Sequence, residues 1–325
     1  MKKIISLVLC TAIFASAFLM TGCGKKKSSP LALGLGIHTS ADLKNAKDGQ
    51  NGGGTATSTA AAVLLEGNTV VRCVLDAAEN QLAFTSDGKA IASEDTLTKR
   101  EQGDGYGMKA YGGAKLEWYE QANAFGMLAE GKTVDEIKTL VASDGKGTDE
   151  VIRAGCTIDV SDFVRAIEKA AANAAPSASS KTDTLKLGAA TLRTMQDATA
   201  EADGANQTET TFFAATVDPS GTITAAYSDC VQVEFTFNEE GFSQASGQWT
   251  VSTKRDSGDA YGMKQYGGAD LEWYEQANAF DRACLGKKAS GISTLLGEDG
   301  YGSLELQRAG CTIAINGFVK AASKI

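Results

Sequence analysis

A stretch of 23 residues occurs twice in this chain. The first copy, GDGYGMKAYGGAKLEWYEQANAF, runs from Gly103 to Phe125, and the second, GDAYGMKQYGGADLEWYEQANAF, runs from Gly258 to Phe280. The copies differ only at the pairs Gly105/Ala260, Ala110/Gln265 and Lys115/Asp270. Such a close repeat indicates that both copies form the same local structure, a Gly-rich loop that leads into an aromatic helix.

The repeat extends well beyond this stretch. From Tyr106 to Cys156 the first copy aligns with the second without a gap, at a pitch of 155 residues. Upstream, LALG at Leu31 corresponds to LKLG at Leu185. Between the copies, residues 173–184 have the small, polar and Pro-containing composition of a linker. We therefore predict two tandem homologous domains, at residues 31–172 and 185–325.

Within each unit, β-prone segments precede the helical ones. Examples are NTVVRCVLD at residues 68–76 and VQVEFTF at residues 231–237, while DPSG at Asp218 has turn composition. We interpret residues 48–58, DGQNGGGTATS, as a flexible loop. Helical spacing then predicts one helix over residues 116–129 and another that contains Phe163, Ile167 and Ala171. Strands followed by helices predict an α+β fold, each domain an antiparallel strand layer packed with two or more helices.

The N-terminus has the pattern of a targeting segment. Lys2 and Lys3 precede an apolar run that ends at Met20, and small residues then lead to Cys23. This resembles a bacterial lipoprotein signal, which implies a signal peptide at 1–22, a lipid on Cys23 and a tether at 23–30. We expect a protein anchored on the extracytoplasmic face of the cell membrane. The alternative is an uncleaved anchor, for which the apolar run is short.

Composition excludes several classes of function. The net charge is −9 and no basic patch alternates with aromatics, so we expect no nucleic-acid partner. His38, the only histidine, falls near the start of the domain in a segment that we interpret as flexible. We therefore predict neither a His-ligated metal nor a catalytic triad. The thiols after Cys23 are odd in number, which favours buried free cysteines over a disulfide framework.

Several motifs, taken in order, resemble the FMN-binding domain family of bacterial electron-transfer flavoproteins. The strand turn is DPSGTI at Asp218, and GDGYGMK and GDAYGMK stand in place of the Gly-rich loop of that family. The helix ends in ANAFGMLAEGK and ANAFDRACLGK. AGCT at Ala154 and again at Ala309 takes the place of the Ser-Gly-Ala-Thr that opens the last helix in the family.

The resemblance implies FMN as cofactor. We expect the Gly-rich loop to form one wall of the FMN site and the Ala-Gly-Cys-Thr motif to form the other. A small-residue turn that opens a helix presents free backbone N–H groups to a phosphate. In the family the final Thr can carry FMN through a phosphoester. The residues that the resemblance assigns to FMN are Gly155 and Thr157 with Tyr106, Met108 and Lys109 in the first copy, and Gly310 and Thr312 with Tyr261, Met263 and Lys264 in the second.

Two functions are possible. The first, which we predict, is flavin-dependent electron transfer with redox partner proteins outside the cytoplasm, as the resemblance implies. The second, kept as the alternative, is a flavin-free structural or ligand-binding lipoprotein of the cell envelope that keeps the fold. Ala154 replaces the first Ser or Thr of the family motif, and Val151 replaces an Asp that often precedes it. These departures favour the second alternative. Helical spacing places Trp118 and Trp273 mainly in the core.

Overall fold

The structure is a computed structural model that describes residues 29–93 and 97–325. The signal peptide and Cys23 lie outside the described residues, so the lipid anchor stays a prediction. In the described part of the chain, no helix is both long enough and apolar enough to cross a membrane.

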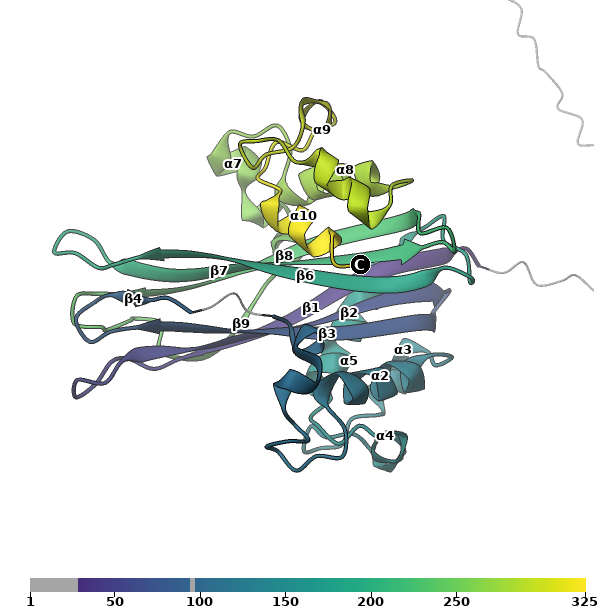
Figure 1. The fold of residues 1–325 in the computed structure, drawn as a ribbon, viewed down its shortest axis with the longest axis horizontal. Helices are drawn as coiled ribbons and strands as arrows, with labels where there is room; N and C mark the ends of the chain where they lie inside the picture. Colours follow the sequence, from purple (N-terminus) through teal and green to yellow (C-terminus); the bar gives the residue numbers. More distant parts are fainter. Residues whose placement is uncertain (1–28, 94–96) are drawn as a thin grey trace, which may run out of the picture.

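Two antiparallel sheets pack face to face, and helices cover the outer face of each (Figure 1). The first sheet has the order β4-β3-β2-β1-β5, with β9 also paired to β1, and the second has the order β6-β7-β8. The fold is therefore α+β, as predicted. The strands are β1 (Leu31–Leu43), β2 (Gly52–Glu66), β3 (Thr69–Phe84), β4 (Ala90–Ile91), β5 (Ala175–Pro176), β6 (Thr184–Gln196), β7 (Gly204–Val217), β8 (Ile223–Phe237) and β9 (Gly247–Val251).

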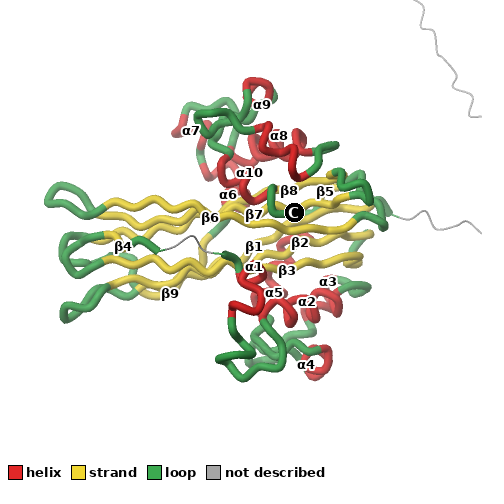
Figure 2. Tube along the Cα trace, viewed as in Figure 1, coloured by secondary structure: helices red, strands yellow, loops and turns green. Residues whose placement is uncertain are grey.

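The helices follow the strands in each half, in the same order. They cover only part of the strand length, and Figure 2 shows the strands continuing beyond them to one end of the molecule. The helices are α1 (Lys99–Gln102), η1 (Gly103–Tyr106), α2 (Trp118–Ala129), α3 (Val134–Lys138), α4 (Asp149–Ala154), α5 (Ser161–Ala172), α6 (Lys254–Ser257), η2 (Gly258–Tyr261), α7 (Met263–Gly267), α8 (Trp273–Cys284), η3 (Ala289–Leu295), α9 (Leu304–Arg308) and α10 (Asn316–Ala322).

The two halves share the topology of their first three strands and differ at the fourth, since β4 pairs with β3 of its own half whereas β9 pairs with β1 of the other. In each, three consecutive strands form an antiparallel meander, and the register shifts at corresponding places, Leu64/Leu65 and Thr216/Val217. The aromatic helices α2 and α8 lie against β3 and β8, with Trp118 and Trp273 buried as predicted.

The inner faces of both sheets share one hydrophobic interior. Leu33 and Leu35 of β1 cluster with Phe212 and Ala214 of β7, because alternate side chains of each strand point to the opposite sheet. Buried hydrogen bonds also cross between the halves, including Asn80 Nδ2 to Thr210 Oγ1 at 3.1 Å. The expectation of two separate domains is therefore not confirmed, since both halves contribute to the same core.

The segment around Gly52 was wrongly interpreted as a flexible loop. Only residues 48 and 49 form the turn, and β2 begins at Gly52. The glycines are there because the chain passes close to its neighbours: a Cβ on Gly52 would overlap the ring of Phe84, and one on Gly54 would overlap the carbonyl oxygen of Asp42. Glycine in a strand can mark such a close approach.

Glycines of β1 also set the distance of helix α5 from the first sheet. A Cβ on Gly36 would overlap the backbone of Ala166 and Ala170 in α5. The corresponding contact in the second half is made by Gly188, against the carbonyl oxygen of Ala321. These small residues allow backbone-to-backbone packing.

We predict that Gly36→Ala lowers the free energy of unfolding by about 1–3 kcal/mol, because the added methyl group pushes α5 off the sheet. The measurement is urea denaturation followed by circular dichroism. Gly267→Ala is the control, since a Cβ there meets nothing within 4 Å, and we expect it to change stability by less than about 1 kcal/mol. Equal stability of the two variants would contradict the packing argument.

Candidate functional site

A buried carboxylate holds the repeated loop from within. The backbone N–H groups of Met108 and Lys109 donate to the carboxylate of Glu117, at 2.8 and 3.1 Å. Glu117 precedes α2 and is only 1% exposed. The second copy repeats this geometry at 2.9 and 3.2 Å, with Glu272 as acceptor. We call this arrangement the glutamate clamp.

Gln121 in α2 connects the loop to Thr157. Its Oε1 accepts from both the backbone N–H and the hydroxyl of Thr157, at 2.8 and 3.0 Å, and its Nε2 donates to the carbonyl of Leu116. Gln276 and Thr312 make the same pair of bonds at 2.8 and 2.9 Å. The structure thus brings the two predicted walls together, but through a buried amide side chain that lies between them.

The Ala-Gly-Cys-Thr motif does not open the last helix, as the sequence analysis expected. Ala154 ends the short helix α4, and Gly155 caps it in the left-handed region with φ of 106°. Helix α5 begins only at Ser161. Gly310 has φ of 102° in the second copy. The motif is a helix stop, because glycine adopts the positive φ of a C-terminal cap without strain.

Other predicted loop residues have partners within the chain. Lys109 Nζ lies 3.2 Å from Glu120 and 3.8 Å from Asp104. The ring of Tyr106 lies under the ammonium group of Lys99, 5.1 Å from its centroid. In the second copy, Lys264 is paired with Glu275 and the ring of Tyr261 lies under Lys254. The loop therefore has its own internal network of charges.

These residues do not fit a flavin phosphate. In the Ala-Gly-Cys-Thr turn, which was expected to hold the anion, the N–H groups of Gly155 and Cys156 already donate to backbone carbonyls of α4. The N–H and hydroxyl of Thr157 both donate to Gln121. On the other side, the N–H groups of Met108 and Lys109 donate to Glu117. A phosphate placed on the loop would also face the buried carboxylate, and like charges in such a position repel. Met108 packs against the hydrophobic core, with its sulfur 3.8 Å from Gln121 Nε2.

The five cysteines among the described residues are free, as predicted. Cys156 and Cys311 are buried, and burial raises the pKa of both thiols to about 11. Thiols with such pKa values stay protonated at neutral pH and react slowly.

The sequence analysis missed the upstream end of the repeat. Thr98, Lys99 and Arg100 recur as TKR at residues 253–255. In the first copy, Thr98 caps α1, and the guanidinium of Arg100 donates to the carbonyl of Leu75. The backbone N–H of Arg100 donates to buried Asp76, whose pKa burial raises to about 6. Extending the alignment of the two copies by five residues toward the N-terminus would have revealed this repeated Thr-Lys-Arg segment.

We predict that Glu117→Gln lowers the free energy of unfolding by about 1–3 kcal/mol, because one of the two loop N–H groups then faces an amide donor. Urea denaturation of the full chain measures the loss. Lys115→Asp is the matched control, since it installs the second copy's residue at an exposed position, and we expect a change within about 0.5 kcal/mol. If Glu117→Gln is as stable as the control, the clamp is not structural.

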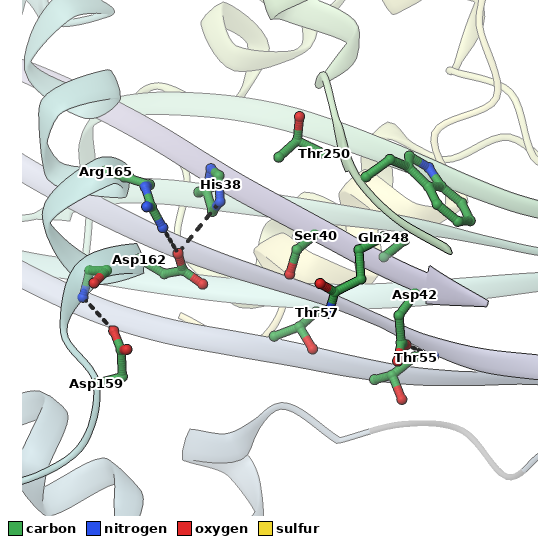
Figure 3. A pocket seen from close by; sticks show the side chains of 13 residues that line it. His38, Ser40, Asp42, Thr55, Thr57, Asp159, Asp162, Arg165, Gln248 and Thr250 are labelled. Carbon is green, nitrogen blue, oxygen red and sulfur yellow. Dashed lines mark hydrogen bonds and ion pairs between the residues drawn. The ribbon is translucent and has the colours of Figure 1, made fainter. Parts of the chain in front are cut away.

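A second candidate site is a polar cleft of about 920 Å³ on the outer face of the first sheet. It lies where β1, β2 and β9 continue past the N-terminal end of α5 (Figure 3). Strands β1, β2 and β9 contribute alternate side chains, and the first turn of α5 forms the remaining wall. The lining residues are His38, Ser40, Ala41, Asp42, Thr55, Thr57, Asp159, Ser161, Asp162, Arg165, Gln248, Trp249 and Thr250.

Two polar rows cross the three strands in this cleft. Ser40 of β1 is directly opposite Thr57 on one side and Thr250 on the other. In the next row, Asp42 is opposite Gln248 and its Oδ1 accepts from the backbone N–H of Thr55 at 2.7 Å. Residues opposite each other in an antiparallel pair share a face, so both rows point into the cleft.

His38 belongs to this cleft rather than to a flexible start, which corrects the sequence analysis. It lies in β1, and its Nε2 is 3.5 Å from Asp162 Oδ1, which also accepts from Arg165 at 2.7 Å. Burial lowers the pKa of His38, against the opposing effect of Asp162. The lowered pKa favours the neutral form of the imidazole. With three aspartates and one arginine, the cleft carries a net negative charge.

The cleft chemistry belongs to one half only. At the corresponding positions of the second half, Ala190 replaces His38, Ala314 replaces Asp159 and Gly317 replaces Asp162. The two halves share a scaffold, but the polar site has developed on the first.

Comparison with protein-family models, curated proteins and solved structures finds no match for this chain. The candidate functions therefore depend on the geometry described above and on the sequence motifs.

Proposed function

We propose that the protein is a flavin-free, ligand-binding lipoprotein of the cell envelope, tethered through Cys23 on the extracytoplasmic face of the membrane. Its ligand is a neutral molecule rich in hydroxyl groups, of the saccharide type, and the cleft on the first sheet holds it. The observation that carries the proposal is the pair of polar rows across β2, β1 and β9.

The chemistry of the rows suits a saccharide. Ser40, Thr57 and Thr250 have hydroxyls that both donate and accept. Each can therefore donate a hydrogen bond to a ligand hydroxyl or accept one from it. Asp42 adds an acceptor and Gln248 adds both kinds of group. The cleft volume lies within the range of about 300–1,000 Å³ found for small-molecule sites. The net negative charge disfavours phosphates and other anionic ligands.

This proposal is preferred to flavin-dependent electron transfer. The donors of the Ala-Gly-Cys-Thr turn that the resemblance assigned to the FMN phosphate already donate within the chain. The glutamate clamp likewise engages the loop N–H groups of Met108 and Lys109, and the buried thiols offer no redox chemistry in place of a flavin. No side chain in the cleft is arranged as a nucleophile with a base, since His38 is directed to Asp162 and Arg165 rather than to Ser40 (Figure 3). We therefore propose binding, without a catalytic step.

The test is calorimetric titration of the mature protein with oligomers of N-acetylglucosamine. We predict that Ser40→Ala combined with Thr57→Ala weakens binding by at least about tenfold, because two hydrogen bonds of about 1 kcal/mol each are lost. Thr194→Ala is the matched control, because Thr194 takes the place of Asp42 in the second half, outside the cleft, and its affinity should equal that of wild type. Absence of binding by wild type, or unchanged affinity in the double variant, would contradict the proposal.

A further inference from the structure

The repeat displays one tyrosine in each copy almost completely to solvent. Tyr111 is 93% exposed and Tyr266 is 80% exposed, the highest fractions among the large hydrophobic side chains of the described residues. An ideal Cβ on Gly107 would lie 2.6 Å from the ring of Tyr111, and one on Gly262 would lie 2.5 Å from Tyr266. Each ring therefore lies against bare glycine backbone on one side, with the rest of its surface open.

Internal packing does not account for this pair of tyrosines. Other polar residues of the repeat have clear internal roles: Glu117 forms the clamp, Gln121 binds Thr157, and Tyr119 donates its hydroxyl to Asp104 at 3.2 Å. The three pairs that differ between the copies are all at exposed or half-buried positions, which shows that the surface of the repeat can change. The exposed tyrosine is nevertheless the same in both.

The two tyrosines belong to segments on opposite sides of the molecule. Tyr266 is in α7, which lies beyond the second sheet, and Tyr111 is in the equivalent loop before α2, a helix that lies beyond the first sheet (Figure 1). One chain therefore presents two equivalent exposed aromatic contacts, which suits a long ligand that repeats.

The surroundings of each ring restrict the kind of partner. The lysine two residues before each tyrosine is paired within the chain, Lys109 with Glu120 and Lys264 with Glu275. Gly112 and Gly113 follow Tyr111, and Gly267 and Gly268 follow Tyr266, so the ring is bordered by backbone. A single ring is much smaller than the roughly 800 Å² per partner of a stable protein interface. It matches one sugar ring, whose C–H groups pack on an aromatic face.

We propose that Tyr111 and Tyr266 form two equivalent stacking sites for the sugar rings of a neutral polysaccharide, so that one chain binds a glycan at two points. This site is separate from the cleft and does not depend on the function proposed for it. Two weak contacts on one chain gain strength through effective concentration.

The test is electrophoresis in native gels that contain hydroxyethyl cellulose, with carboxymethyl cellulose as a charged polymer of the same backbone. Wild type should be retarded by the neutral polymer more than by the anionic one. Tyr111→Ala and Tyr266→Ala should each weaken the interaction about tenfold, and the double variant should migrate as in a polymer-free gel. Tyr111→Trp should keep the retardation, because stacking needs only an aromatic face.

Tyr301→Ala is the control, since Tyr301 is exposed but has Lys146 as its counterpart in the first half. Ser40→Ala with Thr57→Ala should leave retardation unchanged, which separates this proposal from that for the cleft. Retardation of the double tyrosine variant equal to that of wild type would overturn the proposal. So would failure of both polymers to retard wild type, which would assign the tyrosines to a protein partner, and so would stronger retardation by the anionic polymer.

Discussion

The buried carboxylates of Glu117 and Glu272 are the interaction on which the repeated stretch depends. A glycine-rich loop presents backbone N–H groups that need an acceptor, and in many proteins a bound phosphate supplies it. Here the acceptor comes from the residue that precedes the following helix. The two N–H groups therefore have an acceptor without a bound ligand, and the aromatic helix holds the loop against the sheet. This explains why so long a stretch is the same in both halves.

The internal hydrogen bonds of the loop limit which surfaces of the molecule can bind a ligand. With its N–H groups used internally, the loop no longer offers an anion site, and the surface features that remain are the exposed tyrosines and the cleft. The tyrosines are present in both halves. The polar groups of the cleft are present in one, since Ala190 and Gly317 stand where the first half has His38 and Asp162. The two homologous halves thus share one core but have different surfaces.

The sequence predicted those features that depend on local periodicity. The helix with Trp118 and Phe125 on one face, the turn at Asp218 and the burial of the thiols are all present. Glycine was harder to interpret, because the same residue begins a loop, ends a helix or permits close packing. Gly155 was assigned to a helix start and ends a helix, while Gly52 was assigned to a loop and lies in a strand.

Long-range pairing was beyond local sequence patterns. Strand β9 leaves the second half to pair with β1 of the first, and it completes the cleft with Gln248 and Thr250. The sequence of residues 247–251 does not indicate which strand they pair with. The packing of the two sheets on each other could not be predicted for a similar reason. An alternating pattern predicts that one face of a sheet is buried, but it does not predict that the sheet of the other half buries that face.

The central claim is that the repeated loop is closed by its own glutamate. Residue-specific amide hydrogen exchange in ligand-free protein tests it most directly, at Met108, Lys109, Met263 and Lys264. The account predicts that these loop amides exchange slowly without any added ligand, and that Glu117→Gln accelerates exchange at Met108 and Lys109 while leaving Met263 and Lys264 protected. Rapid exchange in the free protein, with protection that develops only on addition of FMN or phosphate, would contradict the account.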